Sequence, residues 1–282
     1  MTISVAYLGP VGTNAETAAI QYINWLKNQT GEDSLLCPYP TISQGISAAI
    51  SEVDFAVVPV ENSIEGSVTV TLDSLWRLDS LRIQYALVLP IQHALITNAK
   101  TLAEIKTVYS HPQALSQCQE WLDKHTPSVQ IIPSNSTSEA LKYLEGDDSA
   151  AAIASPRAAQ LYHIPILAHP INDYPDNYTR FWVLSQKDHD QDRRDRTHTS
   201  LAFSVPANVP GALVKPLEIF ASRGINLSRI ESRPTKRSLG DYVFFIDIEA
   251  DATQPEVEVA LKELENHTET LKILGSYRVL PL

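Results

Sequence analysis

The residues best suited to hydrogen-bond chemistry stand in short polar segments beside predicted strands. The most informative segment is Asn177–Leu184, with the sequence Asn-Tyr-Thr-Arg-Phe-Trp-Val-Leu. Successive side chains of a β-strand point to opposite faces, so Thr179 and Phe181 would share one face and Arg180 would lie on the other. Arg180 could reach the same ligand as Thr179 only if the strand begins at this point. The same pattern also fits a plain edge strand.

Two further polar segments directly follow predicted strands. Gly9–Thr13 leads into a helix that Thr13 can cap, and the free backbone N–H groups of that helix could bind an anion. Val58–Val68 contains Asn62 and Ser63, which could donate hydrogen bonds to an oxygen-rich ligand. Loops at the carboxyl ends of parallel strands commonly face a cleft. A plain turn with a capping role is the alternative for each segment.

A third segment, His111–Gln113, follows a strand and opens a helix, with Pro112 where the first turn of a helix accepts proline. Gln113 and Gln117 are four residues apart, so they share one face of that helix. The alternative is that His111 caps the helix or is a half-buried structural histidine.

Composition and motif content exclude several other classes of protein. The 282 residues carry 22 Lys+Arg against 33 Asp+Glu, a net charge of −11, whereas nucleic-acid binders gain much of their affinity by neutralising phosphates. Cys37 and Cys118 cannot form a disulfide framework, and the eight histidines lack metal-ligand spacing. Nucleotide-binding, zinc-hydrolase and α/β-hydrolase motifs are absent, as are an apolar run of membrane-spanning length and a signal peptide. We therefore expect a cytoplasmic protein that needs no cofactor or metal and binds neither nucleic acid nor membranes.

The predicted elements up to residue 185 indicate an α/β unit. Short apolar runs alternate with segments of helical periodicity, which is typical of a largely parallel sheet. Phe55–Val58 is apolar throughout, as expected for a strand covered on both faces. These strands are too many for one simple sheet, and we therefore expect two lobes with a cleft between them. The predicted strands are Ile3–Leu8, Leu35–Pro40, Asp54–Pro59, Ile83–Leu89, Thr107–Ser110, Val129–Ile132 and Ala150–Ala154.

The order of elements changes after residues 186–198. Aspartates and arginines alternate in that stretch with almost nothing apolar to bury, so we predict a linker; a charged loop within one domain is the alternative. Residues 199–282 then follow the order βαββαβ of a ferredoxin-like domain. The elements are strands Thr199–Val205, Leu227–Arg233, Tyr242–Ala250 and Ile273–Val279, and helices Gly211–Arg223 and Pro255–His267. The predicted division is therefore 1–185, 186–198 and 199–282.

Taken together, the polar segments resemble the prephenate dehydratase family. The matching segments are Gly9–Thr13 (GPVGT), Val58–Val68 (VPVENSIEGSV), His111–Cys118 (HPQALSQC) and Asn177–Phe181 (NYTRF). Four motifs in one order are far more specific than any one of them. A departure is Asn14-Ala15, where the family commonly carries an aromatic and then a hydroxyl residue. Because the first strand begins at Ile3, we expect no chorismate mutase domain in front of it.

The second part of the chain resembles an ACT regulatory domain through Gly211–Val214 (GALV) and Glu231–Pro234 (ESRP), so the resemblance covers essentially the whole chain. It implies a catalytic domain of two α/β lobes, built like a type II periplasmic binding protein with the active site between the lobes. The implied enzyme is a carbon–oxygen lyase of phenylalanine biosynthesis that converts prephenate to phenylpyruvate.

Such a site must orient a dicarboxylate and help hydroxide to leave. A strong cation on the ring carboxylate would stabilise the ground state more than a transition state that is losing this charge. The family's Thr-Arg-Phe motif implies that Thr179 is the catalytic donor, through a hydrogen bond to the leaving oxygen or a relay. Arg180 is either a carboxylate clamp or a structural ion pair, and strand alternation favours the ion pair. The other substrate-binding candidates are Thr13, Asn62, Ser63, Gln113 and the apolar wall Phe181.

The ACT resemblance implies feedback inhibition by phenylalanine, bound at a subunit interface of a homodimer or a dimer of dimers. The helix predicted to begin near Gly211 would offer free amides to the carboxylate of the effector. A solvated strand face is the alternative for Glu231 and Arg233. The effector-binding candidates are Gly211, Ala212, Leu213, Asn226, Leu227, Ser228, Glu231, Ser232, Arg233 and Pro234.

Two other functions fit these motifs. Arogenate dehydratase performs the same elimination on the transaminated substrate, and no residue in the sequence decides between a keto and an amino side chain. A non-catalytic amino-acid sensor would combine a binding-protein-like domain with an ACT domain. The intact motif around Thr179 argues against the sensor, because a sensor needs no donor aimed at a leaving hydroxyl.

Overall fold

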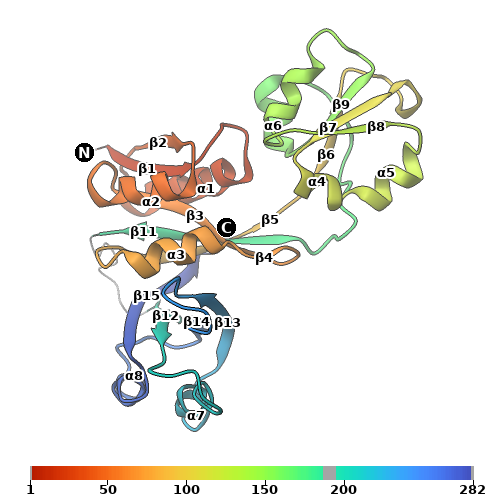
Figure 1. Cartoon of the computed structure of the whole chain (residues 1–282). Helices are drawn as coiled ribbons and strands as arrows, with labels where there is room; N and C mark the ends of the chain where they lie inside the picture. The colour runs from red at the N-terminus through yellow and green to blue at the C-terminus, as the bar shows by residue number, and fades with distance from the viewer. Residues whose placement is uncertain (1, 187–194, 281–282) are drawn as a thin grey trace.

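The large lobe is a sheet of parallel and antiparallel strands covered by helices on both faces in the computed structural model, which describes residues 2–186 and 195–280 (Figure 1). Its elements are β1 (Ile3–Leu8), α1 (Asn14–Thr30), β2 (Ser34–Tyr39), α2 (Ile42–Ser51), β3 (Phe55–Asn62), β4 (Gly66–Ser67), α3 (Thr69–Arg77), β5 (Arg82–Pro90) and β11 (Tyr178–Ser185). Strand β1 pairs in parallel with β2 and β3, while β11 lies antiparallel between β3 and β5. Phe55 and Val57 join the core under α1, and Ala56 and Val58 join the core under α2 and α3. The apolar run at the start of β3 is therefore buried on both faces, as predicted.

The small lobe is inserted between β5 and β11. It contains β6 (Ala94–Thr97), η1 (Leu102–Glu104), β7 (Thr107–Ser110), α4 (Pro112–Ser116), α5 (Gln119–His125), β8 (Gln130–Pro133), η2 (Glu139–Leu144), β9 (Ala150–Ala154), α6 (Pro156–Tyr162) and β10 (Ile166–Ala168). Its five strands run in the order β10-β6-β9-β7-β8. Two chain crossings, after β5 and before β11, join the lobes (Figure 1). This arrangement confirms the predicted fold of two lobes, like that of a type II periplasmic binding protein.

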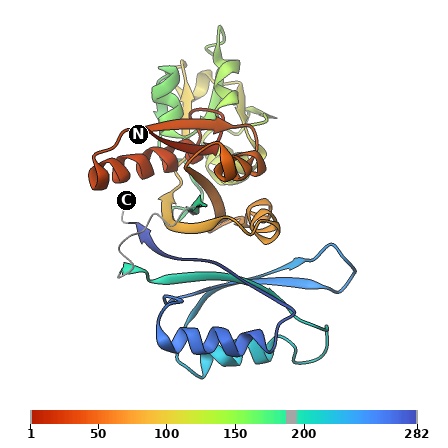
Figure 2. The ribbon, with the colours of Figure 1, turned by 90° about the vertical axis from the view of Figure 1, so that its left-hand side faces the viewer.

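The C-terminal unit has the predicted βαββαβ order. Its elements are β12 (His198–Ser204), α7 (Val214–Ala221), β13 (Leu227–Pro234), β14 (Tyr242–Ile248), α8 (Pro255–Glu265) and β15 (Thr270–Leu280). Both helices cover one face of its sheet (Figure 2), where Phe203 and Ile246 pack against Phe220 of α7. The opposite face packs on the large lobe, because Phe245 shares a core with Leu72 of α3.

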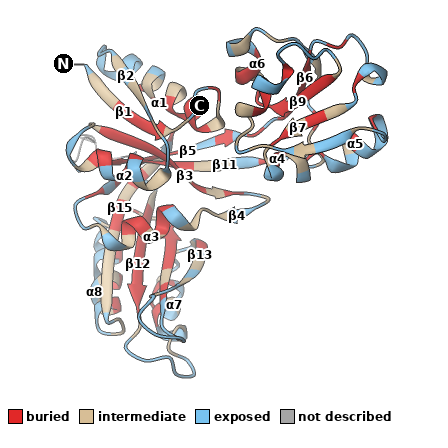
Figure 3. Cartoon of the chain, turned by 45° about the horizontal axis from the view of Figure 1, so that its top comes forward, coloured by how far each residue is buried: buried red, intermediate tan, exposed pale blue. Residues whose placement is uncertain are grey.

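Strand β15 ties the C-terminal unit to the large lobe. Its last residues, Arg278–Leu280, pair in parallel with Tyr85–Leu87 of β5. A Cβ atom at Gly275 would lie 2.5 Å from the carbonyl oxygen of Ile83, so only glycine allows the two backbones to approach this closely. The resulting sheet of ten strands runs β13-β14-β12-β15-β5-β11-β3-β1-β2, with β4 paired to β3. Buried residues follow the middle strands of all three units (Figure 3).

The structure departs from the predicted elements in a few places. The sequence pattern gave no sign of β4, β6 or β10, which are only two to four residues long. Helix α7 begins at Val214 instead of Gly211, because Gly211 has a φ of +84° and belongs to a turn. The predicted linker 186–198 falls largely on residues 187–194, which lie outside the described residues. Within the described residues, no helix is long and apolar enough to cross a membrane.

Candidate active site

A cavity of about 660 Å³ lies between the two lobes. This volume is within the range of sites that hold small molecules, roughly 300–1,000 Å³. The loops after β1, β3 and β7 contribute to its wall, together with the start of β11 and the helical segment η2. The predicted residues that line it are Thr13, Asn62, Gln113, Thr179 and Phe181. Four segments far apart in the sequence therefore meet at one site, as their polar character suggested.

Asn62 and Thr179 are neighbours in the paired strands β3 and β11. Asn62 Oδ1 accepts hydrogen bonds from the backbone amides of Ile64 (3.1 Å) and Glu65 (3.0 Å). Because backbone amides only donate, this contact fixes the orientation of the Asn62 side chain. Its Nδ2 then donates to Thr179 Oγ1 at 2.9 Å. The Thr179 oxygen accepts from Asn62, so the hydroxyl proton of Thr179 is free to be donated to a molecule in the cavity.

The network continues behind Asn62 through buried amides. Asn62 Nδ2 also donates to Asn177 Oδ1 (2.7 Å), and Asn177 Nδ2 donates to Gln117 Oε1 (2.9 Å). His93 Nε2 lies 3.0 Å from the same Gln117 oxygen, so this nitrogen carries the proton. Burial lowers the pKa of His93 below its usual value near 6.5, against the opposing effect of the hydrogen bond to Gln117. His93 is therefore neutral at pH 7, and the whole network is uncharged up to Gln117.

The sequence patterns did not assign these partners a role. Gln117 stands one helical turn from Gln113, and Asn177 opens the segment that contains Thr179, so both carried a signal that could have been used. His93 carried none, because only the fold brings it to Gln117. These three side chains are all buried.

The loop after β1 meets the small lobe at one side of the cavity. Thr13 Oγ1 accepts from the backbone amide of Glu16 at 3.2 Å and caps α1, as predicted. The carboxylate of Glu16 accepts from the Gly12 amide at 2.7 Å, so an internal anion already occupies part of this helix end. Asn14 and Ala15, the positions that depart from the family pattern, line the cavity here. The site predicted for an anion is therefore partly filled by the protein itself.

The lobes touch on both sides of the cavity. On one side Ser155 Oγ donates to the carbonyl oxygen of Gly12 at 2.9 Å. Gly12 has a φ of +88°, and a Cβ there would lie 3.3 Å from Ser138 Oγ, so glycine suits this contact. On the other side Gln117 Nε2 donates to Glu65 Oε1 at 3.2 Å.

Two predicted substrate-binding residues, Ser63 and Arg180, do not line the cavity, and we correct both predictions. Ser63 Oγ donates to the carbonyl oxygen of Asp176 and accepts from the amide of Tyr178, so it joins the turn after β3 to the start of β11. Arg180 points to the opposite face of β11 from Thr179. Its Nη1 lies 3.0 Å from Asp247 Oδ2, which makes it the structural ion pair that strand alternation favoured.

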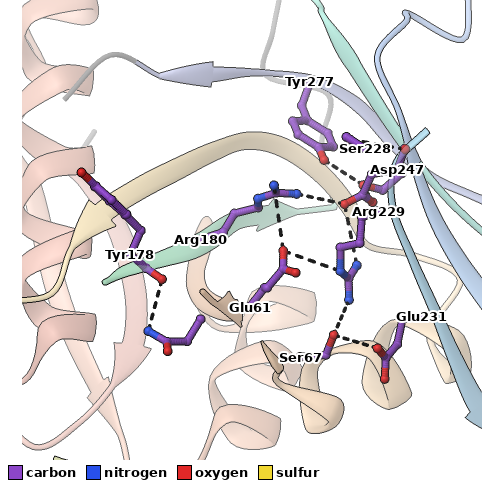
Figure 4. Close-up of polar contacts among 11 residues, drawn as sticks. Glu61, Ser67, Tyr178, Arg180, Ser228, Arg229, Glu231, Asp247 and Tyr277 are labelled. Atoms are coloured by element: carbon purple, nitrogen blue, oxygen red, sulfur yellow. Dashed lines mark hydrogen bonds and ion pairs between the residues drawn. The ribbon is translucent and has the colours of Figure 1, made fainter. Parts of the chain in front are cut away.

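Arg180 belongs to a group of four charges between the large lobe and the C-terminal unit (Figure 4). Glu61 Oε2 lies 3.9 Å from Arg180 Nη2 and 3.7 Å from Arg229 Nε, and Asp247 Oδ2 lies 3.7 Å from Arg229 Nη1. We call these four residues the interdomain cluster. Burial and the Asp247 carboxylate raise the pKa of the neighbouring Tyr277.

The predicted effector-binding residues fall into two groups at opposite ends of the C-terminal unit. Gly211–Leu213 follow the loop in which Asn208 Nδ2 donates to the carbonyl oxygen of Gly240, at the tip of the β13–β14 hairpin. Asn226–Ser228 lie at the other end of β13, where the Asn226 carbonyl accepts from the amide of Glu249. Glu231–Pro234 continue β13 toward the first end. The described residues of one chain therefore do not gather these candidates into one pocket.

Two family models together match most of the chain. A family model described as prephenate dehydratase matches residues 5–189, and a model of the ACT domain matches residues 199–266. The bifunctional chorismate mutase/prephenate dehydratase of Aquifex aeolicus is 43% identical over 276 residues, which are 98% of this chain and 73% of that protein. The prephenate dehydratase of Methanocaldococcus jannaschii is 37% identical over 281 residues, 99% of each chain.

A solved structure shows the same likeness in three dimensions. The prephenate dehydratase from Arthrobacter aurescens, in complex with L-Phe, is similar with a TM-score of 0.86 and 36% identity, over 98% of this chain and 90% of that one. Within the described residues, no group of three or more His, Cys, Asp or Glu side chains could hold a metal ion.

Proposed function

The chain belongs to the prephenate dehydratase family, and from that membership we propose that it converts prephenate to phenylpyruvate, carbon dioxide and water. The single observation that carries this proposal is the Thr179 hydroxyl, which lines the cavity while its oxygen accepts a hydrogen bond from Asn62. The enzyme is then a carbon–oxygen lyase, and the aromatisation of the substrate ring supplies the driving force.

The reaction breaks two bonds of the substrate ring. The electron pair of the bond to the ring carboxylate moves into the ring as carbon dioxide leaves, and the C4–O bond breaks as hydroxide leaves. The departing oxygen needs a hydrogen-bond donor, and it ends as water after gaining one proton. Thr179 supplies the donor directly or relays a proton. A positioned donor of this kind contributes roughly 10²–10⁴-fold to the rate.

The charges around the cavity suit a substrate that loses one of its two carboxylates. Lys142, on η2, is the sole lysine or arginine among the described residues that line the cavity. We assign Lys142 to the carboxylate of the side chain, which keeps its charge throughout the reaction. Gln113 is a neutral donor that lines the cavity and orients the remaining oxygens, whereas Asn62 donates its two N–H groups to Thr179 and Asn177. The ring carboxylate is thereby left without a strong cation that would stabilise the ground state.

Phe181 supplies an apolar wall beside Thr179. Its side chain is buried, and it lines the cavity from the same strand, β11. An apolar neighbour excludes water, and hydrogen bonds in such a site are stronger than they are in water. The Thr179 donor therefore acts where its effect on the leaving oxygen is largest.

We further propose that residues 1–185 form the catalytic domain, 186–198 the linker and 199–282 the ACT domain, and that phenylalanine inhibits the enzyme through the ACT domain. The support is the ACT match and the similarity to a dehydratase that was solved in complex with L-Phe. The separation of Gly211 from Asn226 in one chain supports a homodimer or a dimer of dimers, with the effector between subunits.

The experiment that tests this function offers prephenate and arogenate separately, each with and without phenylalanine. Formation of phenylpyruvate from prephenate, slowed by added phenylalanine, is the expected result. Conversion of arogenate alone would identify an arogenate dehydratase. Phenylalanine binding with no turnover of either compound would identify a sensor and would overturn the proposal.

A further inference from the structure

The turn that carries Asn62 is held from two directions. We call residues 61–67, from the end of β3 through the whole of β4, the β3–β4 turn. On the cavity side, Asn62 Oδ1 holds the amide of Glu65, and Glu65 Oε1 accepts from Gln117 Nε2 across the two lobes. Gln117 in turn accepts from Asn177, which accepts from Asn62. The turn and the network behind Thr179 therefore form a closed circuit of hydrogen bonds.

On the other side, the C-terminal unit contacts the same turn (Figure 4). Ser67 Oγ donates to Glu231 Oε2 at 3.1 Å and accepts from Arg229 Nη2 at 3.1 Å. Arg229 Nε also lies 3.7 Å from Glu61 at the other end of the turn. Two residues of β13 thus hold both ends of the segment that positions Asn62.

Arg229 holds the turn with only some of its hydrogen-bond donors. Its side chain is 4% exposed, yet its Nε and Nη1 atoms make no hydrogen bond among the described residues. The carboxylates of Glu61 and Asp247 are 3.7 Å away, close enough for charge attraction only. Strand β13 is the outermost strand of its sheet, so one of its edges has no partner strand among the described residues. A buried guanidinium with unmade hydrogen bonds would gain stability from a second arrangement that makes them.

We propose that the β3–β4 turn couples the ACT domain to the catalytic cavity, with Glu65 as a positioning residue for the Thr179 network and Ser67 as the contact that β13 controls. The inference rests on the proposed function, because it concerns regulation of the same site. An effector that recruits Glu231 takes it from Ser67, which releases the turn and loosens both Asn62 and the bond from Glu65 to Gln117. A ligand shifts such an equilibrium only through contacts that differ between the two states, and the Ser67 contact is one that differs.

Ser67→Ala tests the coupling, because it removes both hydrogen bonds from β13 to the turn. The variant should resemble the effector-bound state. Without phenylalanine its turnover of prephenate should fall about fivefold or more toward the inhibited rate, and added phenylalanine should lower it little further. Phenylalanine should bind more tightly by a similar factor in calorimetry, because binding no longer breaks a contact and linkage is reciprocal.

Asp73→Asn is the matched control. Asp73, on α3, pairs with Arg233 and Lys236 of the C-terminal unit but does not touch the turn. Its turnover without phenylalanine should equal that of the unmodified enzyme. Equal losses in Asp73→Asn and Ser67→Ala would show that any loosened contact between these units lowers activity, and the inference would fail.

Glu65→Ala and Glu65→Gln test the positioning role without an effector. Loss of the acceptor should lower kcat about tenfold while KM stays within about twofold, because the network acts on the chemical step. Glu65→Gln keeps an oxygen that can accept from Gln117, so it should restore most of kcat. Equal impairment of both variants, or none in either, would overturn the positioning role.

Failure of this inference differs from failure of the proposed function. If the unmodified enzyme turns over prephenate and responds to phenylalanine, but Ser67→Ala behaves identically, the coupling is wrong and the function stands. If the unmodified enzyme has no turnover, the function fails, and tighter phenylalanine binding by Ser67→Ala would still support the coupling. If phenylalanine does not bind at all, the regulatory part of both is overturned.

Discussion

The paired strands β3 and β11 present two kinds of polar face. Toward the cavity they place Asn62 opposite Thr179, and toward the C-terminal unit they place Glu61 opposite Arg180. The cavity face and the network behind it consist of neutral amides, a hydroxyl and a histidine whose pKa is lowered, and the network meets a charge only at Glu65. The interdomain face belongs to the interdomain cluster, which contains two positive and two negative side chains.

The difference follows from the charge that each face has to accommodate. Buried charges are tolerated when they are paired, as in the interdomain cluster, because each compensates the lost hydration of its neighbour. In the cavity the substrate brings two negative charges and loses one during the reaction. Oriented neutral dipoles can favour the transition state there, whereas a fixed cation on the ring carboxylate would favour the ground state. Alternation along the two strands thus places the proposed catalytic side chains on one face and the charges that hold the C-terminal unit on the other.

Thr179→Val should break the cavity face and have the largest effect. It keeps the shape of the side chain but removes the donor, so turnover of prephenate should fall by about 10³-fold with little change in folding. Thr179→Ser keeps a hydroxyl and should retain much of the rate. Steady-state kinetics of both variants, with chemical unfolding as a check on stability, decide the matter. A near-normal rate for Thr179→Val would remove the proposed donor.

Arg180→Met should break the interdomain face instead. It leaves Asp247, which is fully buried, with only the more distant Arg229 as a charged partner, so unfolding in denaturant should become easier by about 3 kcal/mol. KM for prephenate should stay nearly unchanged, because Arg180 does not line the cavity. Arg82→Met, at an exposed arginine of β5, is the control and should change stability little. A large rise in KM for Arg180→Met would instead support a role for Arg180 as a carboxylate clamp.

The two faces should also differ in how pH affects them. Burial lowers the pKa of His93 in the folded chain, so below about pH 6.5 the unfolded chain binds a proton more readily and stability falls; above that pH His93 has no effect. The loss should reach at most about 1.4 kcal/mol per pH unit. His93→Gln should remove this part of the pH dependence, measured by denaturant unfolding between pH 5 and pH 8, each value taken at about constant ionic strength.

His198 provides the contrast on the charged side. Its pKa is lowered first by burial and then by Arg180, and Glu249 and Asp247 oppose the shift. Its contribution to stability should therefore also be lost as pH falls below about 6.5, but it should depend on salt concentration, unlike that of His93. Equal salt dependence at both histidines would show that the two faces do not differ in charge as described.

Sequence patterns predicted most of the strands and helices because these depend on local properties, whereas the type II periplasmic-binding-protein fold was implied by the family resemblance. The apolar run at the start of β3 and the all-apolar β9 are strands that must be covered on both faces, and both are. Alternation along β11 correctly separated Thr179 from Arg180. The short strands β6 and β10 were not predicted.

The network behind Thr179 could not be read from the sequence because its members are brought together only by folding. Asn62 and Asn177 are 115 positions apart, and His93 and Gln117 belong to neither of the strands that pair there. Ser63 was misassigned for a related reason. Its hydroxyl looked available for a ligand, but the return of the chain at Asp176 takes it up.

A double-mutant cycle between Asn62 and Thr179 tests the central claim most directly. In the unmodified background Asn62→Ala should lower kcat by about 10²-fold, because the Thr179 hydroxyl loses the partner that orients it. In the Thr179→Val background the same change should lower kcat less than about threefold, since no hydroxyl is left to orient. Equal losses in the two backgrounds would show that Asn62 and Thr179 act independently and would contradict this account of the site.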